Sequence, residues 1–153
     1  MIQDLKDVIY HNEYKEQGPI EGDYIIFASG RSVLVKKESE TIEFPRLEEI
    51  NSEMVYRYLF QIDINGKIQK FFLGESDKLP DDLLITYGYE RQNLFRTMKP
   101  DYMAFAGVTA CQLANWYVSV KYCGTCGTAL VHDKRERMMR CPDCNAMHYP
   151  KIS

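Results

Sequence analysis

The chain has 153 residues, of which 45% are hydrophobic and 27% are charged, and its formal net charge is −3. This length and composition are those of an ordinary globular protein, with room for one domain of about 100 to 120 residues and a small module. No stretch approaches the ~20 apolar residues of a membrane span, and the charged, amphipathic N-terminus contains no apolar signal core. We therefore expect a cytoplasmic protein that does not contact membranes.

The first third of the chain predicts a short helix followed by strands. Apolar residues between Ile2 and Ile9 fall on one face of a helix. The apolar run 23–28 and the run that starts at 32–35 flank a Ser-Gly-Arg turn, which predicts two antiparallel strands. A short strand is expected over 41–44, where a proline follows.

The strongest local signal is a β-hairpin. Alternating apolar residues over 55–64 and 67–73 flank the dipeptide Asn65-Gly66. Asn-Gly between two such runs is the preferred sequence of a type I′ turn, because both residues adopt positive φ readily.

The region before the cysteines predicts a strand over 83–87, a turn of helix over 89–95 and a longer helix over 101–117. Small and apolar residues recur at helical spacing in the last of these, and Pro100 and Asp101 suit its first turn. Its small side chains would let it pack closely on a sheet.

Four cysteines form two Cys-x-x-Cys pairs, Cys123 with Cys126 and Cys141 with Cys144. Each pair places two thiolates on one side of a turn, and two such turns in a hairpin supply the four sulfurs of a tetrahedral structural Zn²⁺ site. An iron site of the rubredoxin type uses the same ligands. Two disulfides would need an oxidising compartment, and a redox Cys-x-x-Cys would stand alone.

We therefore expect an α+β fold with an N-terminal antiparallel β-sheet domain and packing helix over 1–120, followed by a four-cysteine zinc ribbon over 121–151. Six basic and three acidic residues lie between Lys121 and Lys151, so the ribbon carries +3 and the rest −6. This asymmetry favours either an anionic ligand near the ribbon or contact between the two parts. Cys111 is expected to be a buried small residue, and His132 has no visible partner.

Several spaced motifs carry a family resemblance. They are Gln112–Tyr117 (QLANWY), Tyr122–Gly127 (YCGTCG), Glu136-Arg137, Arg140–Cys144 (RCPDC) and His148–Ser153 (HYPKIS). Together they closely resemble the NADH pyrophosphatase branch of the Nudix hydrolases, whose bacterial members also remove NAD caps from RNA. The resemblance is sharp over 112–153 and only architectural over 1–111.

The resemblance implies part of an NAD(H) diphosphatase, which splits NADH into NMNH and AMP. In that family a catalytic Nudix domain would start near residue 152, and its glutamate-rich box, which holds Mg²⁺ or Mn²⁺, is absent from this sequence. We therefore expect a non-catalytic portion that scaffolds the enzyme, contributes to binding of NAD(H) or NAD-capped RNA, forms homodimers and is inactive alone. A truncated chain is the favoured explanation, and a stand-alone relic is the other.

The resemblance also implies substrate contacts at Tyr149, Glu136, Arg96 and Arg46. The tyrosine could instead pack between domains, and Glu136 could be a solvated hairpin charge. The match at Arg96 needs a gap, and that at Arg46 is the weakest of the four. Two other functions stay open, namely a basic zinc ribbon that binds RNA or a protein partner without chemistry, and a purely structural module.

Overall fold

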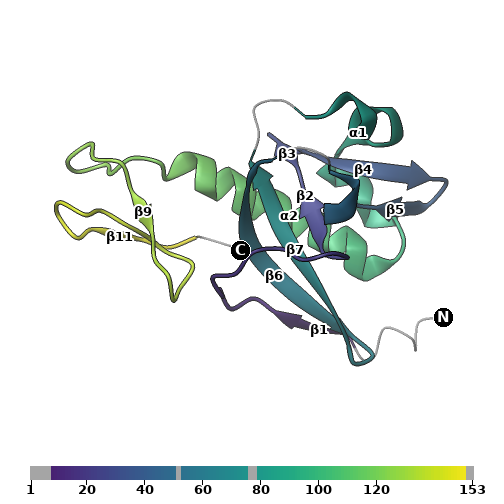
Figure 1. The fold of residues 1–153 in the computed structure, drawn as a ribbon, viewed down its shortest axis with the longest axis horizontal. Coiled ribbons are helices and arrows are strands. Elements are labelled where there is room, and N and C mark those ends of the chain that lie inside the picture. The colour runs from purple at the N-terminus through teal and green to yellow at the C-terminus, as the bar shows by residue number, and fades with distance from the viewer. Residues whose placement is uncertain (1–7, 51–52, 76–78, 151–153) are drawn as a thin grey trace.

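The computed structural model describes residues 8–50, 53–75 and 79–150, without the side chains of Leu94 and Arg96. A mixed sheet forms the body of the N-terminal part (Figure 1). Its order is β1-β6-β7-β2, with bounds Val8–His11, Val55–Ile64, Lys67–Glu75 and Tyr24–Ile26. The first three strands pair antiparallel, whereas β2 runs parallel to β7.

The β6–β7 hairpin confirms the strongest sequence prediction. Asn65 and Gly66 have φ of 53° and 87°, which is the conformation of a type I′ turn. Both faces of this hairpin are covered, because Phe71 lies in one apolar cluster and its neighbour Phe72 in the other. The alternation of strand side chains thus divides the core into two layers.

A second set of strands packs beside this sheet around β4, which pairs with β3, β5 and β8. The bounds are Ala28–Ser29 for β3, Ser32–Glu38 for β4, Thr41–Glu43 for β5 and Gly88–Arg91 for β8. The predicted turn at Gly30 is confirmed, and so is the short strand that begins at Thr41.

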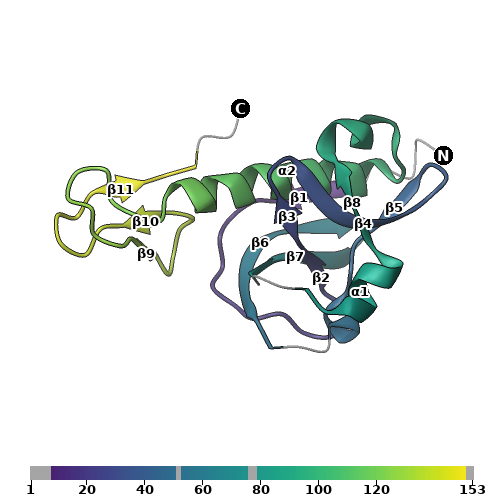
Figure 2. The same ribbon diagram turned by 90° about the horizontal axis from the view of Figure 1, so that it is seen from above.

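The long helix α2 (Asp101–Ser119) confirms the predicted packing helix. Its small residues Ala106 and Ala110 are fully buried against the same cluster as Phe60 and Phe71 of the hairpin. Cys111 is also fully buried, as expected. Figure 2 shows α2 running from the sheets to the C-terminal ribbon, so one helix belongs to the N-terminal core and reaches the ribbon.

Three local predictions were wrong. Val8 and Ile9 belong to β1 and not to a helix, because they pair with Ile64 and Asp63 of β6; the rest of that predicted helix lies outside the described residues. Residues 83–87 fall mostly in helix α1 (Asp81–Thr86), which buries Leu83. The predicted helical turn over 89–95 is split between β8 and the 3₁₀ helix η3 (Gln92–Thr97).

A further 3₁₀ helix, η2, spans Leu47–Glu49.

The C-terminal part is a small three-stranded sheet in the order β11-β10-β9. Each strand has two residues, Val131–His132 in β9, Met139–Arg140 in β10 and Met147–His148 in β11. Among the described residues, no helix combines the length and apolar character that a membrane crossing needs.

Candidate metal centre

The four cysteines of the ribbon come together as the spacing predicted. Their sulfur atoms all lie within 4.8 Å of one another. The Cys123–Cys144 and Cys126–Cys141 sulfurs are 3.6 and 3.3 Å apart, and those of Cys126 and Cys144 are 3.9 Å apart. Four sulfurs at ~2.3 Å from a tetrahedral Zn²⁺ lie about 3.8 Å from each other, so the donor set fits this ion.

Both cysteine turns use the same backbone device. The N–H of Gly127 donates to the carbonyl of Cys123 at 2.9 Å, and the N–H of Asn145 donates to that of Cys141 at 3.0 Å. Gly127 and Asn145 have φ of 77° and 62°, the left-handed conformation that glycine and asparagine adopt at least cost. The two halves of the site are therefore equivalent turns of five residues each, 123–127 and 141–145.

Backbone amides prepare the sulfurs for a cation. N–H groups of Cys126 and Thr125 lower the pKa of Cys123 to about 6. The Ala146 N–H acts in the same sense on Cys144, but the Cys141 and Cys123 sulfurs outweigh it and raise the pKa of Cys144 to about 12. Four thiolates at these distances repel one another, and a bound divalent cation would offset this electrostatic repulsion.

Within the described part of the chain, these cysteines are the one group of three or more metal-ligating side chains close enough to share an ion. Cys123 and Cys141 are buried, whereas Cys126 and Cys144 are exposed. A hydroxyl–carboxylate pair supports the exposed side, because Thr128 donates to Asp143 at 2.7 Å and accepts from the Cys126 thiol. The site is thus closed by protein ligands, as in structural rather than catalytic zinc centres.

Tyr149 lies just after β11 and is 51% exposed. It lines a groove of about 710 Å³ between the ribbon and the C-terminal half of α2. Trp116 and Gln112 line the α2 side of this groove. Within the described residues, the Tyr149 ring is therefore accessible from this groove.

Glu136 lies in the β9–β10 hairpin, where its backbone N–H donates to the Asp133 carboxylate at 2.8 Å. It lines a second groove, of about 640 Å³, together with Lys134, Arg135 and Arg140. Tyr149 and Glu136 thus line different grooves.

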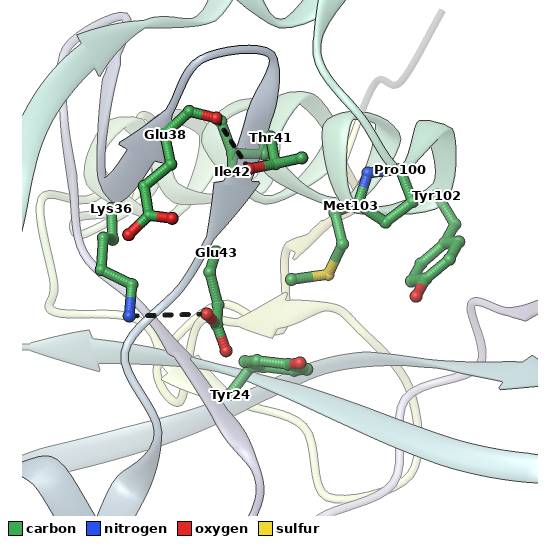
Figure 3. Close-up of a pocket in the computed structure, with 9 residues that line it drawn as sticks. All are labelled: Tyr24, Lys36, Glu38, Thr41, Ile42, Glu43, Pro100, Tyr102 and Met103. Atoms are coloured by element: carbon green, nitrogen blue, oxygen red, sulfur yellow. Dashed lines mark hydrogen bonds and ion pairs between the residues drawn. The ribbon is translucent and has the colours of Figure 1, made fainter.

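Arg46 lies in the N-terminal part and makes structural contacts there. Its guanidinium donates to the Gly22 carbonyl at 2.9 Å and to the Tyr24 hydroxyl at 2.7 Å, and it lies 4.3 Å from the centre of the Tyr24 ring. Figure 3 shows the adjacent pocket, of about 280 Å³, in which Lys36 pairs with Glu43 above Tyr24. The backbone of Arg96 belongs to η3, and its side chain is outside the description.

The sequence analysis found no visible partner for His132, and the structure shows one. Its Nε2 atom lies 2.8 Å from the Tyr117 hydroxyl, and its ring lies against Tyr14 and Tyr117. Tyr14 is separated from it by more than a hundred residues, so no local pattern could have revealed this contact.

Comparison with known proteins finds a family whose model matches the ribbon. Residues 119–149 match the family model of the NADH pyrophosphatase zinc ribbon domain, so this segment is similar to the zinc ribbons of that family. The chain is 32% identical over 82 residues to the NAD-capped RNA hydrolase NudC of Stutzerimonas stutzeri, covering 54% of this chain and 29% of that protein. The NudC proteins of Pseudomonas aeruginosa and Escherichia coli O1:K1 are 39% and 45% identical over 44 and 42 residues, which is 16% of each.

The matched regions therefore span less than a third of the length of these curated relatives. The predicted relationship is confirmed for the ribbon, and the relatives are hydrolases by name. The four predicted substrate contacts stay predictions.

Proposed function

We propose that this chain is the non-catalytic N-terminal and zinc-ribbon portion of an NAD(H) diphosphatase. The whole enzyme would convert NADH to NMNH and AMP and would remove NAD caps from RNA. The observation that carries this proposal is the cluster of four sulfurs within the segment that matches the NADH pyrophosphatase zinc ribbon. In the proposal the ribbon holds one structural Zn²⁺.

The chemical step belongs to other residues in this proposal. Cleavage of a diphosphate by this family needs Mg²⁺ or Mn²⁺ on clustered glutamates, which would neutralise charge and activate water. Residues 1–153 contain no such glutamate-rich box. We therefore expect no release of AMP from NADH by this chain alone.

The proposed contribution to substrate binding is Tyr149. Its ring is exposed beside Trp116 in the groove between α2 and β11, and an aromatic ring with a polar tip can both stack on a base and form a hydrogen bond. Glu136 and Arg46 are weaker proposals, since neither lines the groove of Tyr149, and a contact by Arg96 is proposed from the resemblance alone. A homodimer and a cytoplasmic location are proposed from the resemblance and would be tested by sedimentation and by localisation.

A fluorescence titration tests the binding proposal directly. Trp116 is the single tryptophan of the chain and lines the same groove as Tyr149. NADH that enters the groove should quench Trp116 emission, and Tyr149→Ala should weaken the apparent affinity by roughly tenfold, the loss of one stacked ring.

Tyr122→Ala is the matched control, because Tyr122 is a ribbon tyrosine that is 67% exposed and is not part of the groove lining. Equal affinities of the two variants, or an absence of saturable quenching in the wild type, would refute the role of Tyr149. AMP release from NADH by the chain alone would refute the assignment as non-catalytic.

A binding module for RNA is the second candidate, favoured by the basic side chains that line the hairpin groove with Glu136. Contacts to phosphates make binding weaken steeply as salt rises. Uncapped single-stranded RNA should then bind at low salt with a steep salt slope, and Lys134→Ala should reduce that slope by about one. Binding that is equally strong at high salt, or absent at low salt, would exclude this candidate.

A further inference from the structure

A stack of three rings connects the ribbon to the N-terminal part. The His132 ring of β9 lies with its centroid 4.3 Å from that of Tyr14, at an interplanar angle of 30°. The centroid of Tyr117, in α2, is 5.5 Å from that of His132, at an interplanar angle of 29°. Tyr14 belongs to the segment between β1 and β2, so three distant parts of the chain meet at this imidazole.

Hydrogen bonds fix the tautomer of His132. Its Nδ1 atom lies 2.5 Å from the Asp133 carbonyl oxygen, which can only accept, so Nδ1 carries the proton. The Nε2 atom of a neutral ring then accepts from the Tyr117 hydroxyl at 2.8 Å. If Nε2 were protonated, Nε2–H and the Tyr117 O–H would both point a proton at each other. The Tyr117 hydroxyl would then have to rotate its proton away from His132.

Two guanidinium groups lie close to the same rings. The Arg57 guanidinium of β6 is 4.5 Å from the centre of the Tyr117 ring, and that of Arg137 is 5.9 Å from the centre of Tyr14. Arg137 also donates from Nη1 to the Asn12 carbonyl at 2.7 Å, and this bond is a second link between the ribbon and the N-terminal segment.

The carboxylates near this cluster do not offset both cations. Glu75 of β7 pairs with Arg57 at 2.9 Å. The Asp133 carboxylate accepts from the backbone N–H groups of Arg135 and Glu136 and pairs with Arg140 at 3.8 Å. Glu16 acts on Tyr14 from the N-terminal segment. Among the described residues, Arg137 forms no ion pair, and its Nε and Nη2 atoms are buried without a hydrogen-bond partner.

We propose that His132 is a pH-sensitive latch: its neutral imidazole docks the zinc ribbon on the N-terminal part, and its protonation releases the ribbon. A protonated His132 would add a third positive charge close to the guanidinium groups of Arg57 and Arg137, and this repulsion opposes docking of the charged form. Because the groove of Trp116 and Tyr149 is built from α2 and the ribbon, release would also open that groove.

The direction of the pH effect follows from the environment of the ring. Burial lowers the pKa of His132, and Arg57 and Arg137 lower it further against the opposing hydrogen bond to the Asp133 carbonyl. In the released ribbon the pKa would return to about 6.5. The equilibrium constant for docking of the ribbon is therefore at its full value above about pH 6.5. Below that pH it falls by at most roughly tenfold per pH unit. The fall ends once the pH is below the pKa of His132 in the docked form.

The test uses the zinc-loaded chain between pH 7.5 and 5.8. Residual dipolar couplings report whether the ribbon and the sheets share one alignment, and ring carbon shifts report the titration of His132. Wild-type protein should lose the common alignment as His132 titrates. His132→Phe should show no pH dependence of alignment, and His11→Gln, a histidine in β1, should keep it.

Three outcomes would overturn the latch. The first is a common alignment that persists after His132 has titrated. The second is a pH dependence that survives in His132→Phe, because another group would then be responsible. The third is a release that follows loss of zinc, measured as zinc content at each pH, instead of the His132 titration.

Discussion

The sheet domain and the ribbon solve the same problem of stability by different means. The sheet domain buries large side chains on both faces of the β6–β7 hairpin, among them Phe60, Phe71 and Phe72 at 1% exposure or less. In the ribbon, the buried residues between positions 121 and 150 are Cys123, Met138, Met139 and Cys141, and two of these are candidate metal ligands.

The difference shows how size limits folding. Some thirty residues cannot bury enough apolar surface to offset the entropy of ordering the chain, whereas the larger domain can. We therefore expect the ribbon to depend on a metal ion for its folding, with a smaller contribution from Met139 and Leu130, which pack on the main core. We therefore expect metal removal to unfold the ribbon, and loss of a buried aromatic side chain to destabilise the sheet domain.

The largest expected effect is loss of the ribbon when its metal is removed. Cys141→Ser or a strong chelator should unfold residues 121 to 151, because binding of the metal supplies the folding free energy of such a module. The Asn65-Gly66 hairpin domain should stay folded. Amide NMR signals of both parts, recorded with and without chelator, measure this, and ribbon signals that survive metal removal would contradict the account.

The converse change should break the sheet domain. Phe71 is fully buried and contacts the rings of Tyr24, Phe44 and Phe60, so Phe71→Ala should cost about 3–5 kcal/mol of stability. Urea unfolding followed by circular dichroism measures this loss. The exposed Ile85 is the control, and Ile85→Ala should stay within about 0.5 kcal/mol.

A glycine in α2 sharpens the view of how closely this helix packs. A Cβ on Gly107 would lie 2.5 Å from the Phe95 ring and 3.1 Å from Phe44. Overpacking of about 1–3 kcal/mol should exceed the helix propensity of about 1 kcal/mol that alanine gains. Gly107→Ala should therefore destabilise, whereas Gly88→Ala, which meets nothing within 4 Å, should not. A stabilised Gly107→Ala variant would show that the ring can move.

The smallest expected effect is at the hairpin turn. Gly66 has φ of +87° and an added Cβ would meet no atom within 4 Å, so the cost of Gly66→Ala is confined to the backbone. We expect a loss of about 1 kcal/mol in thermal or urea unfolding. Gly18→Ala, at an open position without positive φ, should be neutral, and equal losses in both variants would argue against a turn-specific effect.

Local patterns predicted those parts of the molecule whose partners are near in sequence. The β6–β7 hairpin and the cysteine turns follow from alternation, Asn65-Gly66 and the spacing of the cysteines. Helix α1 was missed although Pro80 precedes it and two aspartates form its first turn, which is a typical start signal, because residues 83–86 also suit a strand.

Distant contacts account for the rest. Val8 becomes a strand residue because it pairs with Ile64, and β2 runs parallel to β7, which no alternation pattern could show. At the site, spacing predicted that the four cysteine sulfurs would come together but not the contact of His132 with Tyr14. Such contacts depend on how the ribbon docks, which is set by the tertiary structure.

The most direct test of the account is the metal itself. X-ray absorption at the zinc edge, combined with metal content, should give one zinc per chain with four sulfur ligands at ~2.3 Å. Iron in place of zinc, fewer than four sulfurs, or a folded ribbon without metal would contradict the proposal that residues 119–149 form a zinc-dependent ribbon.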